Sequence, residues 1–268
     1  MGPIGDEVIV DIQFNQGAAD WPRMRELVLA AEEAGFGTLW NLDHYSGTMF
    51  GADSMNECFS SLSAWAAVTS TIKVGTLVTN VMNRSAGLLA VSAATVQNIS
   101  GGRFTLGVGA GAAPGSPWGA EQDALGIPML PRMADRHARL ASVVEEMRTI
   151  LSPARDPKFA GFPVADTPIP VIVGVNSASL AQYAGRHCDG VNVGFHHEKR
   201  AEFVRVAREA AGDKAFDASV WDFFSPEMCD PDHPANVGFR DIGLDHTILL
   251  VKGAPDPSVI AGCSRYLR

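Results

Sequence analysis

The chain has 268 residues, a hydrophobic content of 46%, a mean hydropathy of +0.06 and a formal net charge of −9 at pH 7. The negative charge and the lack of clustered Lys and Arg exclude a nucleic-acid surface, because binding to a phosphate backbone needs grouped cations. No apolar run approaches the roughly 18 residues of a membrane span, and no signal-peptide pattern is present, so we expect a cytoplasmic protein without a membrane or nucleic-acid partner.

The first half of the chain alternates short apolar runs with helix-like segments. Asp20 is the expected N-cap of the first helix and Gly35 marks its end. Expected strands are residues 8–14, 38–43, 72–79 and 104–109, and expected helices are residues 21–34, 59–69 and 88–99. Alternation of this kind is typical of parallel βαβ units.

The second half continues the same order with longer connections. A polar loop over residues 112–131 precedes a strongly amphipathic helix from about Arg132 to Leu151. Further expected strands are residues 170–174, 190–195, 218–223 and 246–251, and further expected helices are residues 178–186, 199–211 and 256–267. The segment 225–244 carries prolines and little periodicity, which predicts a short or degraded helix there.

Eight expected strands and seven clear helices favour one (β/α)8 TIM barrel over residues 1–268, an α/β fold with a single domain. A doubly wound open sheet is the competing arrangement. In either fold, ligands bind at the carboxyl ends of the strands. That rule selects as candidate site positions the segments 13–15, 41–45, 79–84, 109–113, 175–179, 192–196 and 222–225, together with Lys252. Substrate specificity is expected to lie in the loops 46–56, 112–131 and 225–244.

Asp43 and His44 stand at the end of an expected strand, where a histidine can act as an acid or base near neutral pH and the aspartate can orient it. A capping aspartate beside a solvated histidine is the alternative. The pair His196 and His197 at another strand end is interpreted as structural or solvated. No HExxH or HxH spacing and no CxxC occur, so we expect no metal site and four reduced, structural cysteines.

Two further stretches carry backbone features that suit a bound anion or ring. The stretch SGGRFTLGVGAG, residues 100–111, ends an apolar strand in glycines, but its spacing departs from GxGxxG and does not predict a Rossmann site. The stretch VNSAS, residues 175–179, opens a helix whose first N–H groups suit a phosphate, although an ordinary N-cap has the same pattern. Trp118 and Trp40 are candidate walls for a flat ring or are packed residues.

The succession AEEAGFGTLWNLDHY, SGGRFTLGVGAG, ALGIPMLPRMADRHARL and PIPVIVGVNSASLAQYAGRHCDGVNVG resembles the luciferase-like monooxygenase superfamily. The likeness is greatest to the branch that uses the deazaflavin coenzyme F420, and it runs from about Val8 to Gly194. It implies a bacterial luciferase-like (β/α)8 barrel that binds a flavin or deazaflavin at the carboxyl ends of the strands, often as a homodimer.

The resemblance also implies roles for individual residues. His44 matches the acid or base beside the reactive ring, with Asp43 orienting it, and Leu77–Val78 matches a segment that often holds a non-prolyl cis peptide. The residues expected to bind the cofactor are Leu77, Val78, Thr79, Gly109, Gly111, Asn176, Ser177 and Ala178. Gln13 and Trp118 are expected to contact a small-molecule substrate.

Departures from the family pattern narrow the expected activity. Ala112 stands where the sugar-phosphate-oxidising members carry a catalytic glutamate, which argues against a sugar-phosphate dehydrogenase. Asn176 replaces a glycine, and Ser85 and Ala86 replace a common His-Pro. We therefore expect an F420-dependent oxidoreductase that transfers hydride to or from an imine or activated C=C bond. An FMN-dependent monooxygenase is one alternative, and a non-catalytic flavin-binding protein is a second.

Overall fold

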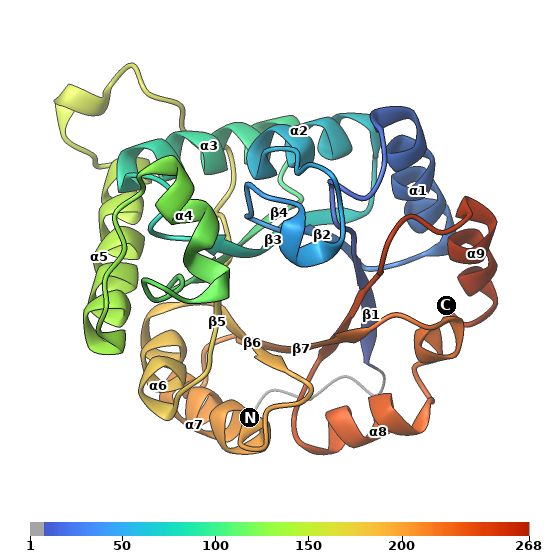
Figure 1. The fold of residues 1–268 in the computed structure, drawn as a ribbon. Coiled ribbons are helices and arrows are strands. Elements are labelled where there is room, and N and C mark those ends of the chain that lie inside the picture. The colour runs from blue at the N-terminus through green and yellow to red at the C-terminus, as the bar shows by residue number, and fades with distance from the viewer. Residues whose placement is uncertain (1–7, 268) are drawn as a thin grey trace.

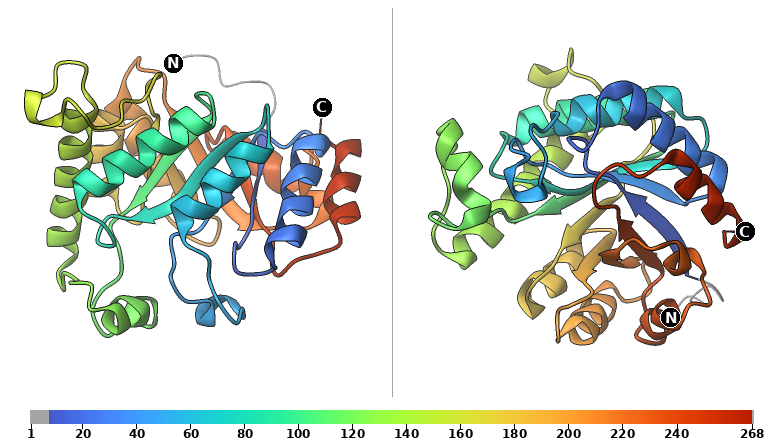
Figure 2. Two further views of the ribbon diagram at one scale, coloured as in Figure 1. Left: turned by 90° about the horizontal axis from the view of Figure 1, so that it is seen from above. Right: turned by 45° about the vertical axis from the view of Figure 1, so that its right-hand side comes forward.

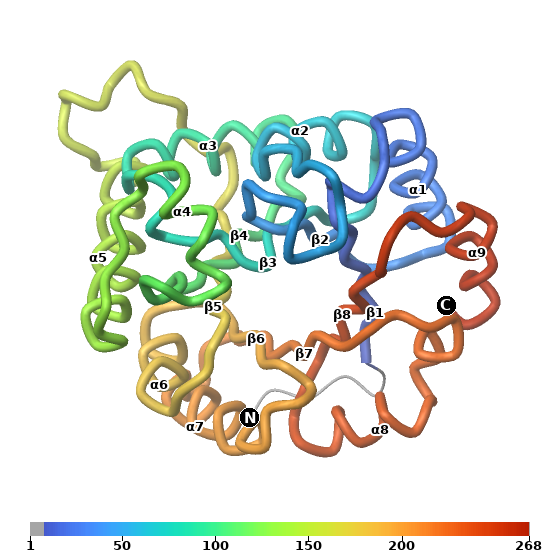
Figure 3. Tube along the Cα trace, in the orientation of Figure 1, coloured from blue at the N-terminus to red at the C-terminus, as the bar shows by residue number. Residues whose placement is uncertain are grey.

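The computed structural model describes residues 8–267 and contains a closed barrel of eight parallel strands (Figure 1). Each strand pairs with the next one in the sequence, and β8 closes the barrel by pairing along β1, beside which it lies in Figure 3. The strands are β1 Ile9–Gln13, β2 Thr38–Asn41, β3 Lys73–Asn80, β4 Phe104–Gly109, β5 Val171–Gly174, β6 Gly190–Gly194, β7 Asp217–Phe223 and β8 His246–Leu250. The predicted TIM barrel is confirmed, and the open doubly wound sheet is wrong.

Apart from α4, which projects over the carboxyl ends of the strands, the helices form an outer ring around the barrel (Figure 1). They are α1 Trp21–Ala34, α2 Cys58–Val68, α3 Ala86–Ile99, α4 Ala120–Leu125, α5 Met133–Leu151, α6 Ala178–His187, α7 Arg200–Ala211, α8 Pro234–Asp241 and α9 Pro257–Ala261. The Asp20 side chain accepts a hydrogen bond from Arg23 N, and Gly35 ends α1 with a φ of 94°, as the sequence predicts. None of the helices within residues 8–267 is long and apolar enough to cross a membrane.

Two helical segments, α4 and α9, differ from the sequence-based prediction, and a third, α8, agrees with it. Helix α4 lies inside the loop predicted over residues 112–131; its residues AEQDAL are good helix formers, but the prolines around them hide the pattern. Helix α8 is short, as the weak periodicity indicates. Helix α9 ends at Ala261 and continues only as a 3-10 turn, Gly262–Arg265, rather than as a helix to residue 267. Gly262 and Ser264 are weak helix formers, which accounts for the early end.

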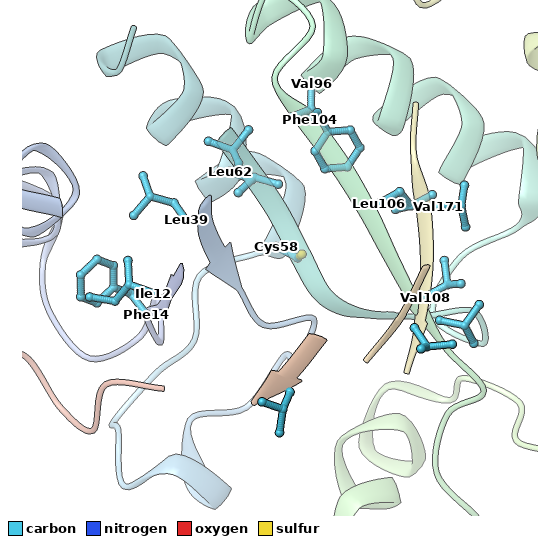
Figure 4. Packing of buried hydrophobic residues seen from close by; sticks show 14 of the residues in the cluster. Ile12, Phe14, Leu39, Cys58, Leu62, Val96, Phe104, Leu106, Val108 and Val171 are labelled. Carbon is cyan, nitrogen blue, oxygen red and sulfur yellow. The ribbon is translucent and has the colours of Figure 1, made fainter. Parts of the chain in front are cut away.

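The main core lies between the barrel strands and the surrounding helices. Phe104 and Leu106 of β4 pack there with Leu62 of α2 and Val96 of α3 (Figure 4). A smaller cluster fills the barrel interior and consists of Trp40, Leu77, Ile172 and Ile248. Gly75 makes room for it, because a Cβ at that position would lie 2.4 Å from the Trp40 ring. This part of the interior is therefore packed with side chains.

The buried polar contacts near this cluster centre on Asp11, whose side chain is fully buried. The Trp40 indole Nε1 donates to Asp11 Oδ2 over 3.1 Å, and His246 Nδ1 lies 3.1 Å from the same oxygen. Because His246 is the first residue of β8, this ion pair lies toward the amino-terminal end of the barrel. Asp11, a charged residue within β1, thus links β1 to β2 and β8 near the amino-terminal end of the barrel.

All four cysteines are buried and none forms a disulfide, in agreement with the expectation of structural cysteines. One spatial pair was not predicted: the sulfur atoms of Cys229 and Cys263 lie 3.1 Å apart although 34 positions separate them. The sequence spacing carries no signal for this contact, because it forms only when the turn after β7 packs against the last turn of the chain.

The loops at the carboxyl ends of the strands project from one end of the barrel. In the left view of Figure 2, helix α4 (green) and the turn Thr48–Phe50 (blue) extend from the same end, whereas the segment around Pro157–Phe159 extends from the other. The candidate site is therefore covered by the β2–α2 connection and by the long β4–α5 connection.

Candidate functional site

A cavity of about 570 Å³ opens at the carboxyl ends of the strands, and every strand or the loop after it contributes to its lining. Predicted site residues that line it are Gln13, Asp43, His44, Leu77, Val78, Gly109, Gly111, Trp118 and Asn176. Thr79, Ser177 and Ala178 do not line it. This volume lies within the range of about 300 to 1,000 Å³ of small-molecule and cofactor sites.

The floor of the cavity contains a non-prolyl cis peptide bond between Leu77 and Val78, at the position that the family resemblance indicates. The pairing of β3 with β4 shifts register there, between Thr76 and Thr79. The Gln13 amide donates to Leu77 O over 2.8 Å, and the buried Thr79 hydroxyl donates to Thr76 Oγ1 over 2.9 Å. Gln13 and Thr79 therefore support this bulge, and a substrate contact of Gln13 stays a prediction.

Gly109 and Gly111, at the end of β4, have neighbours that leave no space for a side chain. A Cβ on Gly109 would lie 2.6 Å from Val78 Cγ2, and one on Gly111 would lie 2.5 Å from Asn80 Oδ1. Gly111 also has a φ of +76°, which side chains rarely tolerate. The glycines expose backbone to the cavity, as expected, but the space of their missing side chains is taken by the bulge and by Asn80.

His44 is held by a glutamate that sequence reasoning missed. Its Nδ1 lies 2.9 Å from Oε1 of Glu121 on α4, and Gln122 Nε2 donates to the same oxygen over 3.0 Å. The backbone N–H groups of Tyr45 and Ser46 donate to Oε2 over 2.8 and 2.9 Å. A carboxylate among these donors acts as an acceptor throughout, so His44 Nδ1 carries a proton.

The second ring nitrogen of His44, Nε2, has no hydrogen-bond partner among residues 8–267. Because His44 lines the cavity, Nε2 is the nitrogen available to a ligand. In the neutral ring it is an acceptor, and in the protonated ring it is a donor. The pair can thus take or give a proton at one defined atom.

Asp43 does not form the predicted orienting contact with His44. Its carboxylate instead accepts hydrogen bonds from both terminal nitrogens of the buried Arg84, over 2.7 and 2.8 Å. It also accepts from Asn80 N over 2.9 Å and from Asn83 Nδ2 over 3.2 Å. Asp43 therefore fixes the turn after β3, since its oxygens are already occupied. Its place in the cavity lining is as predicted, but its partners are not.

Arg84 continues this network to Glu57, the N-cap residue of α2, over 2.6 Å. Burial alone would lower the pKa of Arg84, but hydrogen bonding to Asp43 and its charge, with Glu57, outweigh burial and raise it. The Gln122 amide also donates to Asn83 Oδ1 over 3.0 Å. One continuous set of contacts therefore joins the loops after β2 and β3 to α2 and α4.

Aromatic rings flank His44 on the open side. The ring centroid of Phe50 lies 4.8 Å and that of Trp118 lies 5.8 Å from the imidazole, and Trp118 is half exposed. A second cavity of about 310 Å³ adjoins the first and shares His44 and Trp118 with it. Its other walls are largely apolar and include Met49, Pro117 and Leu125. His44 thus lies at the boundary of two cavities.

The residues at the start of α6 that were predicted to hold a phosphate fall into two groups, those that line the cavity and those that do not. Val175 and Asn176 line the cavity, whereas the Ser177 side chain accepts from Leu180 N over 3.3 Å and Ala178 is the first residue of α6. The Ser177 side chain therefore serves as an N-cap. His196, interpreted as structural, packs on Phe195 and Trp221. No group of residues suited to a metal ion occurs within residues 8–267.

The family model described as luciferase-like monooxygenase matches residues 9–223. The 5,10-methylenetetrahydromethanopterin reductase of Methanolobus tindarius is 32% identical over 190 residues, 69% of this chain and 53% of that protein. An F420-dependent glucose-6-phosphate dehydrogenase of Segniliparus rotundus is 31% identical over 180 residues, 62% of this chain and 52% of that protein. The chain thus matches about half the length of these two relatives.

The barrel is also similar to solved structures. An F420-dependent secondary alcohol dehydrogenase in complex with an F420-acetone adduct superposes with a TM-score of 0.76 at 17% identity, over 97% of this chain and 98% of that one. At this identity the likeness concerns the fold.

Proposed function

The chain belongs to the luciferase-like monooxygenase family, and from that premise we propose that it is an oxidoreductase that uses the deazaflavin coenzyme F420. The observation that carries the proposal is the coincidence of three features in one cavity: the Leu77–Val78 bulge, the exposed backbone at Gly109 and Gly111, and His44 with a free Nε2. The cofactor class is further supported by a relative named as F420-dependent.

The residues present fit a flavin-like ring. Leu77 and Val78 offer an apolar floor, Gln13 holds the bulge by its hydrogen bond to Leu77 O, and Val78 packs where a side chain on Gly109 would lie. Backbone at Gly109 and Gly111 can approach a ring edge, and Asn176 lies at the start of α6, where N–H groups favour an anion. Bound there, the deazaflavin supplies or accepts a hydride.

His44 supplies the proton that accompanies the hydride. In the reducing direction, its protonated Nε2 donates to one atom of the substrate double bond while the hydride reaches the other. In the reverse direction, neutral Nε2 removes that proton. Glu121 keeps the proton of Nδ1 in place in both states, so it positions the ring without exchanging a proton with the substrate.

We place the substrate beside His44, against the wall that Phe50 and Trp118 form together. Both rings lie within 6 Å of the imidazole, and the adjoining smaller cavity has largely apolar walls. Ala112 lines the main cavity with a methyl group where sugar-phosphate-oxidising members have an acid. An uncharged, partly apolar molecule with an imine or activated C=C bond fits these walls better than a sugar.

The test is turnover with reduced F420 and a panel of imines and activated alkenes, with oxygen uptake recorded in parallel. We expect loss of the reduced deazaflavin that depends on the substrate and not on oxygen. Oxygen uptake with reduced FMN, and no reaction with F420, would favour a monooxygenase instead. A protein that binds either cofactor without reacting would be the non-catalytic alternative.

We also propose a homodimer, which the family resemblance supports, and a cytoplasmic location. Sedimentation equilibrium of the purified protein tests the first, and a single species at the monomer mass would contradict it. Fractionation of the source cells tests the second.

A further inference from the structure

Cys229 and Cys263 are two buried thiols in direct contact. Their sulfur atoms lie 3.1 Å apart, and the Cys229 thiol donates to Cys263 Sγ. Both side chains are fully buried and belong to the main core. Neither residue lines either of the two cavities beside His44, so the proposed proton transfer does not use them. The pair is therefore a chemically reactive group without an assigned role.

The two thiols belong to short turns that are distant in the sequence. Cys229 ends the 3-10 turn Pro226–Cys229 after β7, and Cys263 lies in the 3-10 turn Gly262–Arg265 after α9. The two turns pack against each other, and the second one also packs against α1, as α9 does (Figure 1). A bond between the two sulfur atoms would therefore tie the β7–α8 connection to the turn after α9, across 34 sequence positions.

The other two cysteines are different, because neither has a sulfur neighbour within residues 8–267. The Cys58 thiol donates to Asn41 Oδ1 over 3.3 Å, and no partner of the Cys188 thiol occurs in the same part of the chain. Burial raises the pKa of both thiols, and that of Cys188 reaches about 11. Since the thiolate is the reactive form, Cys58 and Cys188 are expected to be inert at neutral pH.

The environment of Cys263 favours its thiolate instead. The hydrogen bond from Cys229 lowers the pKa of the Cys263 thiol and, with the charge of Arg265, outweighs burial and the charge of Glu227. The thiolate is the nucleophile in thiol–disulfide exchange. Both chain neighbours of Cys263 are exposed, and a 3-10 turn has few internal hydrogen bonds, so a local opening of this turn brings the sulfur to solvent.

We propose that Cys229 and Cys263 form a redox-sensitive pair, which a small-molecule disulfide such as oxidised glutathione converts into an internal disulfide bond. The Cys263 thiolate attacks one sulfur of the small molecule and releases the other as a thiolate. The Cys229 thiol then loses its proton and attacks the Cys263 sulfur, which displaces the second small-molecule thiolate. The two protein thiols are oxidised, and the small disulfide is reduced to two thiols that take up the two protons.

The bond needs only a small movement and does not depend on the proposed function. The sulfur atoms have to approach each other by about 1 Å to reach the bond length of about 2.05 Å. The closed loop contains α8, α9 and β8, the strand that completes the barrel against β1. Because such a crosslink restricts the unfolded chain, we expect the equilibrium constant of unfolding to fall by about 10²-fold.

The experiment equilibrates the purified, reduced full chain with oxidised glutathione under native conditions and counts its free thiols after the glutathione is removed. The reduced protein has four free thiols, and we expect two after oxidation. Mass spectrometry of the digested, alkylated protein should show one linked pair of peptides, which contain Cys229 and Cys263. Chemical denaturation of the oxidised and the reduced wild type provides a second readout that needs no variant and no cofactor.

Cys229→Ala and Cys188→Ala are matched variants, because each removes one buried thiol and only the first removes a member of the pair. We expect Cys188→Ala to form the same linked peptides as the wild type, and Cys229→Ala to form none. Circular dichroism shows whether each variant is folded, and if Cys229→Ala is not, the two wild-type readouts decide.

Three results would overturn the proposal. The first is a wild type that keeps all four thiols after equilibration, and the second is a linked peptide pair that appears only in protein unfolded before oxidation. The third is an oxidised protein whose unfolding midpoint is no higher than that of the reduced protein, because the bond would then not stabilise the fold.

Discussion

Two histidine–carboxylate pairs lie toward opposite ends of this barrel and differ in what surrounds them. His44 Nδ1 lies 2.9 Å from Glu121, and His246 Nδ1 lies 3.1 Å from Asp11. Glu121 comes from a loop helix, and its histidine lines two cavities. Asp11 comes from a strand, is fully buried, and also accepts from Trp40 of the interior cluster.

The same local contact therefore serves two purposes. At the carboxyl ends of the strands, the pair leaves one ring nitrogen open to ligands, which suits proton transfer. At the amino-terminal end, the pair is enclosed by packed side chains, which suits stability. Position in the barrel decides the role, and variants at each end should separate rate from stability.

The largest expected effect is that of His44→Ala on turnover. Loss of a general acid or base should lower kcat by about 10²- to 10⁴-fold, while the free energy of unfolding changes little because the ring borders cavities. The measurement is steady-state turnover with F420 beside chemical denaturation. His196→Ala, at another strand end but with an exposed side chain, is the control and should retain its rate.

Asp11→Ala should have the reverse signature. It removes the acceptor of two buried donors, from Trp40 and His246, so the free energy of unfolding should fall by about 2 to 4 kcal/mol. F420 affinity should stay unchanged at temperatures where the protein is folded. Asp135→Ala breaks an exposed pair and should cost less than about 1 kcal/mol. A loss of F420 affinity in folded Asp11→Ala would remove the distinction between the two ends.

Glu121→Gln should have a smaller effect on rate that reports on ring positioning. A glutamine amide cannot accept from the N–H groups of both Tyr45 and Ser46 and also from His44, so the ring loses its fixed proton. We expect kcat to fall about tenfold with KM for F420 unchanged. The nitrogen chemical shifts of His44 should show an Nδ1–H ring in the wild type and a mixture in the variant.

The control for that variant is Glu57→Gln, which removes a carboxylate of the same network that does not touch His44. Its kcat should change little. Identical histidine shifts in wild type and Glu121→Gln would contradict the positioning role.

The smallest expected effect is a pH dependence of the free energy of unfolding, caused by His246 at the amino-terminal end of the barrel. Burial favours neutral His246, but the carboxylates of Asp11, Asp217 and Asp245 outweigh it and raise the pKa of His246 above its ordinary 6.5. A raised folded pKa gives stability that is complete below about pH 6.5 and is lost as pH rises through the folded pKa. His246→Gln should remove this decline, and His196→Gln should keep it. If the free energy of unfolding of wild type and of His246→Gln changed equally with pH across this range, His246 would not be the group responsible.

The sequence predicted the barrel because each buried parallel strand is a local apolar run and each amphipathic helix has its own period. The rule that ligands bind at strand ends selected His44 and Asn176, and the family resemblance selected Leu77 and Val78; all four residues line the cavity. It did not predict the pairing of His44 with Glu121, 77 positions away, or that of Asp43 with Arg84. These contacts depend on how loops fold over the barrel, and the short helix α4 that carries Glu121 is hidden among prolines.

The roles of the two glycines show the same limit. The sequence predicts close backbone approach at Gly109 and Gly111, but only the structure shows that Val78 and Asn80 occupy the space of the missing side chains. Arg136 likewise has the pattern of one charge in an amphipathic helix, and only the structure shows that it lines the cavity.

The most direct test of the central claim is an equilibrium titration of the purified protein with F420 in the presence and absence of excess FMN. The cavity at the carboxyl ends of the strands should bind F420 with one site per chain, and FMN should not displace it. Tight binding of FMN with no measurable binding of F420 would contradict the account.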